Sequence, residues 1–561
     1  MTTDPARLLK KFETAKSEFG GDAAQAKREL LSALQSVRLP NASAILRLHE
    51  ALCYLRALPD NAEILGQVVA MLETFDQRKD VHSHREELAD SGLRGMPIYY
   101  WFFPDTARWL SGRFPGALQV DWEMFEDGEK LRSRLDLLGT WTETLGLDEA
   151  DLPIEDWVAR MAGPHTTDAD FLIQRSAHVG RTDAERDRFY EELNLPLVLQ
   201  PGPKTPSRTL AHLEGRPVHY QTTPLRRQRP DLQQALRQPV REIVCDKKLG
   251  ERIVSLAREA MVLRHRDLDA FSYGDPNDVR LFDCGDGLEF GVIGVRPERR
   301  LMLEAVYAYI TLKNGVPIGY VLTSALFGSS EIAYNVFDTW RGGEAAHVYG
   351  CVLAVTRRLF GSDTFTIYPY QLGGGGNTEG LKSGSWWFYQ KLGFRAREPH
   401  VRKVMERELA KMRKDPKYKT SIETLEDIAE YNVYWTSGRE RDDVIGVFGL
   451  GNVGLRLTAY LAERFGADRE RGLRTCAEEA AKLCGVRGLA RWTKHERLWW
   501  ERWSPLVLAL PGINHWSKPE YQALVAIVRA KGGRRESDFV RLLDAHRKLR
   551  AGLRKLARPV E

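Results

Sequence analysis

The spacing of apolar residues divides the chain into a helical first part, a mixed centre and a helical final part. Apolar residues such as Leu48, Leu52 and Leu55 recur at helical spacing before residue 190, and the same periodicity returns after residue 400. Between them lies a stretch rich in proline, which fixes φ and removes a backbone donor, so an extended linker is expected there. We therefore expect four segments: a helical N-terminal domain (1–194), a proline-rich linker (195–240), a mixed α/β domain (241–400) and a helical C-terminal region (401–561).

The central segment alternates predicted strands and helices. Asn314-Gly315 lies between two apolar runs, and because an Asn-Gly pair supplies the positive φ angles of a tight turn, residues 311–322 should form a β-hairpin. A third strand over 332–337 leads into a glycine-containing turn and a helix that ends near Phe360. A fourth strand over 365–370 precedes the helical segment 384–394. The fold class expected is therefore α/β (α+β), with a central mixed sheet flanked by mostly α-helical regions.

This order of elements resembles the GNAT (Gcn5-related N-acetyltransferase) superfamily, whose hairpin, phosphate-binding helix and terminal Phe-Tyr-x-Lys-Leu-Gly-Phe segment recur in the same order. Here that terminal segment is Phe388–Phe394. The resemblance covers residues 304–394 directly and implies a GNAT-type acyltransferase that uses acetyl-CoA or another acyl-CoA as donor. It leaves the amine acceptor open, whether a small molecule or a protein. The alternative is a GNAT-like domain that has lost catalysis and serves as a ligand-binding or scaffolding module.

The resemblance places the acyl-donor site at the turn Arg341-Gly-Gly-Glu-Ala-Ala346, which opens the helix after the third strand. A helix N-terminus presents unpaired N–H groups and a positive dipole, and small residues let a phosphate approach the backbone. Glu344 stands where the family usually has glycine, and its carboxylate would compete for the same amides. The donor-binding residues implied are Arg341, Gly342, Gly343, Ala345 and Ala346.

The resemblance also implies that Tyr389 protonates the departing CoA thiolate, which a phenol close to the sulfur can do. Attack by an amine needs a base or a water relay, and Glu331 and Asp338 bracket the third strand. Of these two, Asp338 is favoured because it is close in sequence to Arg341. The loop 372–380 is glycine-rich, and its glycines either let a ligand touch the backbone or form a mobile hinge. Asn377 in this loop and Ser383 after it are expected near the mouth of the split between the two central strands, as further donor-binding residues.

Two further motifs carry alternative interpretations. Residues 97–104 form a proline-bounded aromatic run, which is either a buried corner of the helical domain or the wall of a ligand pocket. Gly449-Leu-Gly-Asn-Val-Gly454 matches a dinucleotide-binding fingerprint and follows a strand-like run over 443–448. The fingerprint also needs a second strand ending in an acidic residue, which the sequence does not provide. A nucleotide-dependent oxidoreductase is thus a third alternative resting on one loop.

Composition restricts the function classes. A net charge of +5 over 561 residues is mild, so nucleic acid is not expected as a partner. No apolar run is long enough for a membrane span, and the N-terminus lacks the apolar core of a signal peptide. The six cysteines are scattered and lack metal-ligand spacing, which favours free thiols in the cytoplasm and no bound metal.

Overall fold

The computed structural model describes residues 4–559, and the chain divides into two compact units. Each unit is assembled from segments that are distant in the sequence. Unit 1 comprises Met1–Leu225, Arg252–Tyr273 and Lys313–Pro317, and unit 2 comprises Arg226–Glu251, Gly274–Leu312 and Ile318–Glu561.

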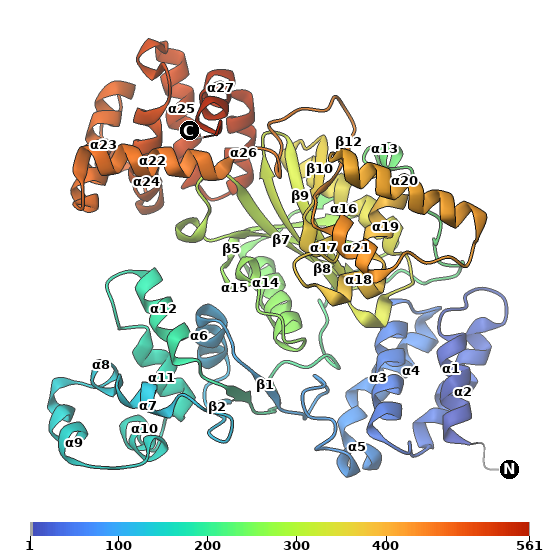
Figure 1. Cartoon of the computed structure of the whole chain (residues 1–561). Coiled ribbons are helices and arrows are strands. Elements are labelled where there is room, and N and C mark those ends of the chain that lie inside the picture. Colours follow the sequence, from blue (N-terminus) through green and yellow to red (C-terminus); the bar gives the residue numbers. More distant parts are fainter. Residues whose placement is uncertain (1–3, 560–561) are drawn as a thin grey trace. The chain divides into compact units, whose positions relative to one another are not determined.

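Unit 1 is mostly helical (Figure 1). Several of its helices begin at a polar cap, as where the Asn41 side chain accepts a hydrogen bond of 2.9 Å from the Ala44 N–H. The α-helices are α1 (Pro5–Ala15), α2 (Ala23–Ser36), α3 (Ala42–Ala57), α4 (Ala62–Glu73), α5 (Lys79–Ser83), α6 (Pro104–Arg113), α7 (Gly128–Arg132), α8 (Leu135–Leu138), α9 (Thr144–Glu149), α10 (Ile154–Ala162), α11 (Asp168–Ser176), α12 (Asp183–Leu193) and α15 (Asp269–Ser272). Two 3₁₀ turns, η1 (Phe75–Gln77) and η2 (Trp141–Glu143), accompany them.

Unit 1 also contains a three-stranded antiparallel sheet, which corrects the expectation of an almost wholly helical first part. The strand order is β1-β3-β2, with β1 (Ile98–Tyr100) and β2 (Leu118–Val120) on either side of β3 (Leu197–Leu199). These strands have three residues each, too few for a period-2 pattern to stand out. The central strand β3 lies inside the expected linker, where Pro196 and Pro201 flank it.

Unit 2 is built on a nine-stranded mixed sheet of order β11-β12-β10-β9-β8-β7-β6-β5-β4. The strands are β4 (Arg241–Ile243), β5 (Gly274–Asp283), β6 (Leu288–Val295), β7 (Ala305–Lys313), β8 (Val316–Leu326), β9 (Ser329–Val336), β10 (Thr364–Ile367), β11 (Arg395–Ala396) and β12 (Val433–Thr436). The mixed α/β class expected from the sequence is thus present.

The hairpin prediction is confirmed. Asn314 and Gly315 have φ angles of 49° and 76° and join β7 to β8, as a two-residue turn of this composition requires. β9 then continues the antiparallel order and leads through the 3₁₀ turn η4 (Asp338–Trp340) into α16 (Ala345–Phe360), which packs against β9 (Figure 1). The fourth strand is shorter than expected, because Pro369 opens a short helix after β10.

Three expectations for the segment after residue 400 are corrected. It is not wholly helical, because β12 lies in the sheet between β10 and β11. The run 443–448 is irregular rather than a strand, so the Gly449–Gly454 fingerprint lacks its preceding strand and lies at the first turns of a helix. The tail over 539–556, whose periodicity predicts one amphipathic helix, forms two helices, because the chain turns at His546, whose imidazole accepts from the Leu549 N–H at 3.1 Å.

The remaining helices of unit 2 lie before β4, between β10 and β12, and after β12. They are α13 (Leu232–Ala235), α17 (Pro369–Leu372), α18 (Thr378–Ser383), α19 (Ser385–Lys391), α20 (Pro399–Lys414), α21 (Ile422–Ala429), α22 (Leu450–Phe465), α23 (Arg469–Cys484), α24 (Lys494–Ala509), α25 (Lys518–Lys531), α26 (Glu536–Ala545) and α27 (Arg547–Leu556). α14 (Lys247–Val262) begins in unit 2 and ends in unit 1, and η3 (Pro297–Arg299), η5 (Leu489–Arg491) and η6 (Ile513–His515) are 3₁₀ turns.

Buried tryptophans of α24 join the C-terminal helices to the sheet. The indole N–H of Trp499 donates to the Pro297 carbonyl at 2.7 Å, and that of Trp503 donates to the Met302 carbonyl at 3.0 Å. Both side chains are at most 1% exposed. The apolar rings therefore bury area while their polar N–H groups stay paired, as buried tryptophan requires.

Candidate functional site

The first feature of the candidate site is the parting of two parallel strands in unit 2. β9 pairs with β8 along its whole length, from Ser329 to Val336. Its parallel pairing with β10 covers only three positions and ends where Glu331 faces Thr366. Residues 332–336 of β9 therefore extend beyond the ladder with β10. An open strand edge offers backbone donors and acceptors to another molecule or to a side chain.

The N-terminus of α16 follows directly from this open edge. Glu344 is the N-cap residue, but its side chain makes no hydrogen bond to the first turn of the helix. Its carboxylate instead accepts from the backbone N–H of Arg226 at 3.0 Å. The expected competition between Glu344 and a phosphate for the helix amides is thus absent in this arrangement. Ala345 and Ala346 are the first two residues of the helix.

The side chain of Arg341 lies at the same turn and is 44% exposed. Its guanidinium forms an ion pair of 2.8 Å with Asp338, and a second ion pair with Glu379. The preceding residues 338–340 form a 3₁₀ turn, and Gly342 has a φ of +81° that favours glycine. Arg341 is therefore placed to bind an anion. In this structure it is paired with two carboxylates of the protein.

The two candidate bases differ strongly in environment. The Asp338 side chain is 83% exposed and paired with Arg341. Glu331 is half-buried within the sheet, and burial, followed by the nearby carboxylate of Glu304, raises its pKa to about 7. A carboxylate with this pKa can take up a proton near neutral pH. The sequence-based choice, Asp338, is thus the exposed and ion-paired carboxylate of the two, and Glu331 is the more buried one.

Tyr389, the expected acid, is buried and reaches the open edge of β9. Its hydroxyl receives a hydrogen bond from the Tyr334 backbone N–H, which lowers its pKa, while the larger effect of burial raises that pKa. Rings pack around it: Tyr349 at 5.6 Å and Phe394 at 5.7 Å between centroids. Because burial raises its pKa, this phenol keeps its proton at neutral pH.

Tyr349, the neighbour of Tyr389, carries an unsatisfied polar atom. Its ring is fully buried, and within the described residues its hydroxyl has no hydrogen-bond partner. A buried hydroxyl without a partner costs about 1–3 kcal/mol, so a bound molecule or a water that paired with it would be stabilised. This atom belongs to the same aromatic cluster and was not singled out from the sequence, which has no local signal for it.

Asn377 and Ser383 make local bonds. Asn377 caps α18, because its side-chain oxygen accepts from the Gly380 N–H at 3.0 Å while its amide donates to the Tyr370 carbonyl at 2.7 Å. The Ser383 hydroxyl donates to the Gly380 carbonyl at 3.0 Å. In the glycine run before them, a Cβ on Gly374 would come within 2.5 Å of the Ala429 carbonyl oxygen. Close packing against α21 thus accounts for glycine at position 374.

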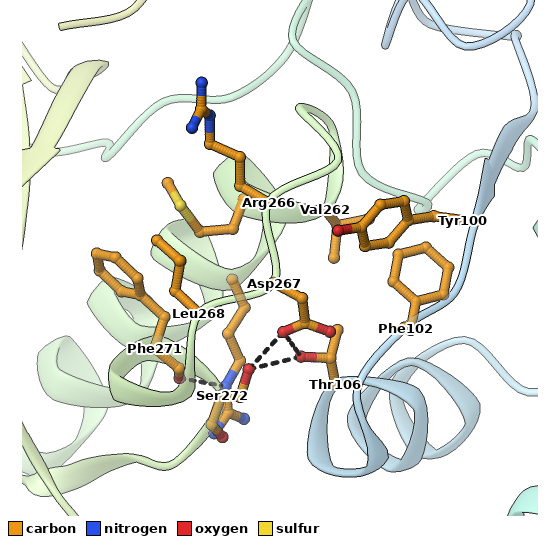
Figure 2. Close-up of a pocket in the computed structure, with 11 residues that line it drawn as sticks. Tyr100, Phe102, Thr106, Val262, Arg266, Asp267, Leu268, Phe271 and Ser272 are labelled. Carbon is orange, nitrogen blue, oxygen red and sulfur yellow. Dashed lines mark hydrogen bonds between the residues drawn. The ribbon is translucent and has the colours of Figure 1, made fainter. Parts of the chain in front are cut away.

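A small cavity in unit 1 lies beside the aromatic run 97–104 (Figure 2). It has room for about one water molecule, and its lining is mainly apolar. Asp267 at its edge accepts from the Thr106 and Ser272 hydroxyls at 2.7 and 2.6 Å. Phe102 is buried there, whereas Trp101 is 46% exposed. The aromatic run is therefore partly a buried corner of unit 1. Because the Asp267 carboxylate is already hydrogen-bonded to Thr106 and Ser272, we assign this cavity a packing role rather than a catalytic one.

Comparison of the chain with models of known protein families, with curated proteins and with solved structures found no match. Within residues 4–559, none of the helices is long and apolar enough to span a bilayer. The same residues contain no group of three or more His, Cys, Asp or Glu side chains arranged to hold a metal ion.

Proposed function

We propose that unit 2 is an acyl-CoA-dependent N-acyltransferase of the GNAT type. The observation that carries this proposal is the strand order around β9: an antiparallel hairpin partner on one side, a parallel partner that leaves it after Glu331 on the other, and a helix N-terminus directly after it. This arrangement supplies an extended backbone edge beside an anion-binding helix terminus. A thioester donor that carries a pyrophosphate within its chain needs both features.

The donor would lie with its pyrophosphate at the first turn of α16. The amides of that turn lack a side-chain cap, and Ala345 and Ala346 leave the approach open. Arg341 would exchange its carboxylate partners Asp338 and Glu379 for phosphate oxygens. The residues present thus fit a pyrophosphate.

The acid and the base lie on two sides of the open strand edge. Side chains alternate along a strand, so Glu331 and Tyr334 point to opposite faces of the sheet. Tyr389 reaches the Tyr334 backbone from the α16 face. Glu331 would accept the proton of the attacking amine, whose nitrogen forms a bond to the thioester carbonyl carbon. The carbon–sulfur bond then breaks, and Tyr389 protonates the leaving thiolate.

The alternative, a binding or scaffolding domain without catalysis, is favoured by the charges at the same turn. The carboxylates of Asp338, Glu344 and Glu379 all lie around it, and negative charge near a helix N-terminus opposes phosphate. Donor binding tests whether the donor site is open, and release of the thiol from acetyl-CoA then separates the two functions, because only the acyltransferase turns the donor over.

The test is isothermal titration of the purified chain with acetyl-CoA and with CoA. We expect binding by the parent, and Arg341→Ala should weaken it about 10-fold, as removal of a charge-assisted hydrogen bond does. Arg407→Ala on α20 is the matched control, since its exposed guanidinium lies in another helix. Binding by Glu344→Gly alone would instead mark a domain whose donor site is closed by its own carboxylate.

Turnover is measured as thiol release from acetyl-CoA in the presence of a panel of primary amines. Glu331→Gln should lose the activity while still binding CoA, because the amide has no proton affinity near neutral pH. Asp338→Asn should retain most of the activity. If Asp338→Asn lost the activity and Glu331→Gln retained it, Asp338 would be the base instead. Absence of CoA binding in the parent and in every variant would refute the acyltransferase.

A further inference from the structure

Two cysteines distant in the sequence meet beside α16. Cys351 lies on the second turn of this helix and is fully buried, whereas Cys284 lies in the turn between β5 and β6 and is partly exposed. The two thiols interact through a hydrogen bond. Both residues belong to unit 2. The chain thus brings together two thiols that no sequence motif connects.

The surroundings of Cys351 are those of an activated thiol. The Gln238 side-chain amide donates to the Cys351 sulfur at 3.2 Å, and the His347 Nε2 lies 3.9 Å from the same sulfur. The hydrogen bond from Cys284, followed by the effect of His347, lowers the pKa of Cys351, although burial opposes this. The same pairing raises the pKa of Cys284, with Asp283 and Glu289 adding to the effect.

The two cysteines therefore differ in the form that their surroundings favour: the lowered pKa of Cys351 favours its thiolate, and the raised pKa of Cys284 favours its neutral thiol. A thiolate is the form that reacts with peroxides, and a second thiol in contact is what converts the product into a disulfide. The pKa of Cys53 is lowered as well, because His49 and Arg56 outweigh the effect of burial, but within the described residues its sulfur contacts His49 and the Arg208 carbonyl and not a second thiol. Burial raises the pKa of Cys245.

We propose that Cys351 and Cys284 form a peroxide-oxidisable thiol pair, with Cys351 as the attacking sulfur and Cys284 as the resolving one. The Cys351 thiolate attacks the O–O bond of a hydroperoxide and becomes a sulfenic acid, and the hydroperoxide is reduced to an alcohol or water. The Cys284 thiol then attacks that sulfur, loses its proton, and displaces the hydroxyl as water. Two thiols are oxidised to one disulfide and one hydroperoxide is reduced.

The disulfide would fasten the β5–β6 turn to α16. This turn also carries Asp286, which forms an ion pair of 2.6 Å with Arg226, and the Arg226 N–H bonds to Glu344. Arg226 thus connects the β5–β6 turn to the residue that precedes α16. A disulfide that fixes this turn would therefore also restrain the N-terminus of α16. The thiol chemistry itself does not depend on acyl transfer, so either proposal can fail alone.

The test is treatment of the folded full-length chain with hydrogen peroxide, followed by thiol alkylation and mass spectrometry without reduction. We expect the intact mass to fall by two hydrogens and a cross-linked peptide pair that contains Cys284 and Cys351. Cys284→Ser should instead accumulate a sulfenic acid at Cys351, which dimedone traps. Cys245→Ser is the matched control and should leave the cross-link unchanged.

The role of His347 is measured separately. His347→Asn should slow dimedone labelling of Cys351 in the Cys284→Ser background by about 10-fold at neutral pH, because less thiolate is present. Circular dichroism establishes that each variant is folded before labelling. The proposal is overturned if both cysteines remain alkylatable after peroxide has oxidised Cys245, or if the sulfenic acid forms on Cys284 in Cys351→Ser at the parent rate.

Discussion

Lys531 provides the sharpest test of how the C-terminal helices are held to the sheet of unit 2. Its side chain is fully buried, and its ammonium donates to the Glu536 carboxylate at 2.5 Å and to the Glu304 carbonyl at 2.8 Å. The charge also lies 4.1 Å from the centre of the Phe539 ring. Burial lowers the pKa of Lys531 to about 8, while Glu536 opposes this shift. The ion pair thus offsets part of a large desolvation cost.

The perturbation is Lys531→Met. Methionine keeps an unbranched apolar stem against Phe539, so the packing loss is small, but Glu536 remains buried without its closest cation. Breaking one partner of a buried pair costs about 3–5 kcal/mol. Arg300 stays 3.8 Å from the other Glu536 oxygen, which limits the loss. We therefore expect a decrease of about 3 kcal/mol in the free energy of unfolding of unit 2.

The assay is urea unfolding followed by tryptophan fluorescence, since Trp499 and Trp503 are buried beside this cluster. The double variant Lys531→Met/Glu536→Gln should recover much of the loss, because no unpaired charge then remains. Lys548→Met is the control, as its ion pair with Glu520 is exposed to water. If Lys531→Met lost less than about 1 kcal/mol, or if the double variant were no more stable than the single one, the buried ion pair would not hold these helices as described.

Three further outcomes are expected. Burial raises the pKa of Asp278 to about 6, so the folded state binds this proton more tightly than the unfolded state. Stability should therefore fall as pH rises from about 4 to about 6, by at most about 3 kcal/mol, and Asp278→Asn should flatten this part of a pH series of urea unfolding curves. Gly315→Ala should destabilise the chain by about 1–3 kcal/mol in thermal unfolding, because φ is +76° and the new Cβ would lie 2.6 Å from the Leu213 carbonyl oxygen; Gly66→Ala, with open space around it, should not. If the acyltransferase proposal holds, Tyr389→Phe should lower kcat about 10²- to 10⁴-fold with KM for the donor nearly unchanged, and an equal effect on both would place Tyr389 in binding instead.

The short strand β12 explains where prediction from the sequence failed. Val433-Tyr-Trp-Thr436 is β-branched and aromatic, as strands are, but it has four residues and follows helical segments. Its pairing partners, β10 and β11, precede it by tens of residues. Because strand identity here depends on non-local hydrogen bonds, local periodicity did not reveal it. The Asn314-Gly315 hairpin was predictable for the opposite reason, since its turn chemistry is local.

Local sequence patterns sufficed to predict the hairpin, the helix after the third strand and the mixed α/β class. The folded chain alone shows which side chains lie together. It buried Glu331 and left Asp338 in water, it turned the Glu344 carboxylate toward Arg226, and it brought Cys284 against Cys351. The physical reason is that propensity and capping act over a few neighbouring residues, whereas burial and charge pairing depend on groups that folding brings together.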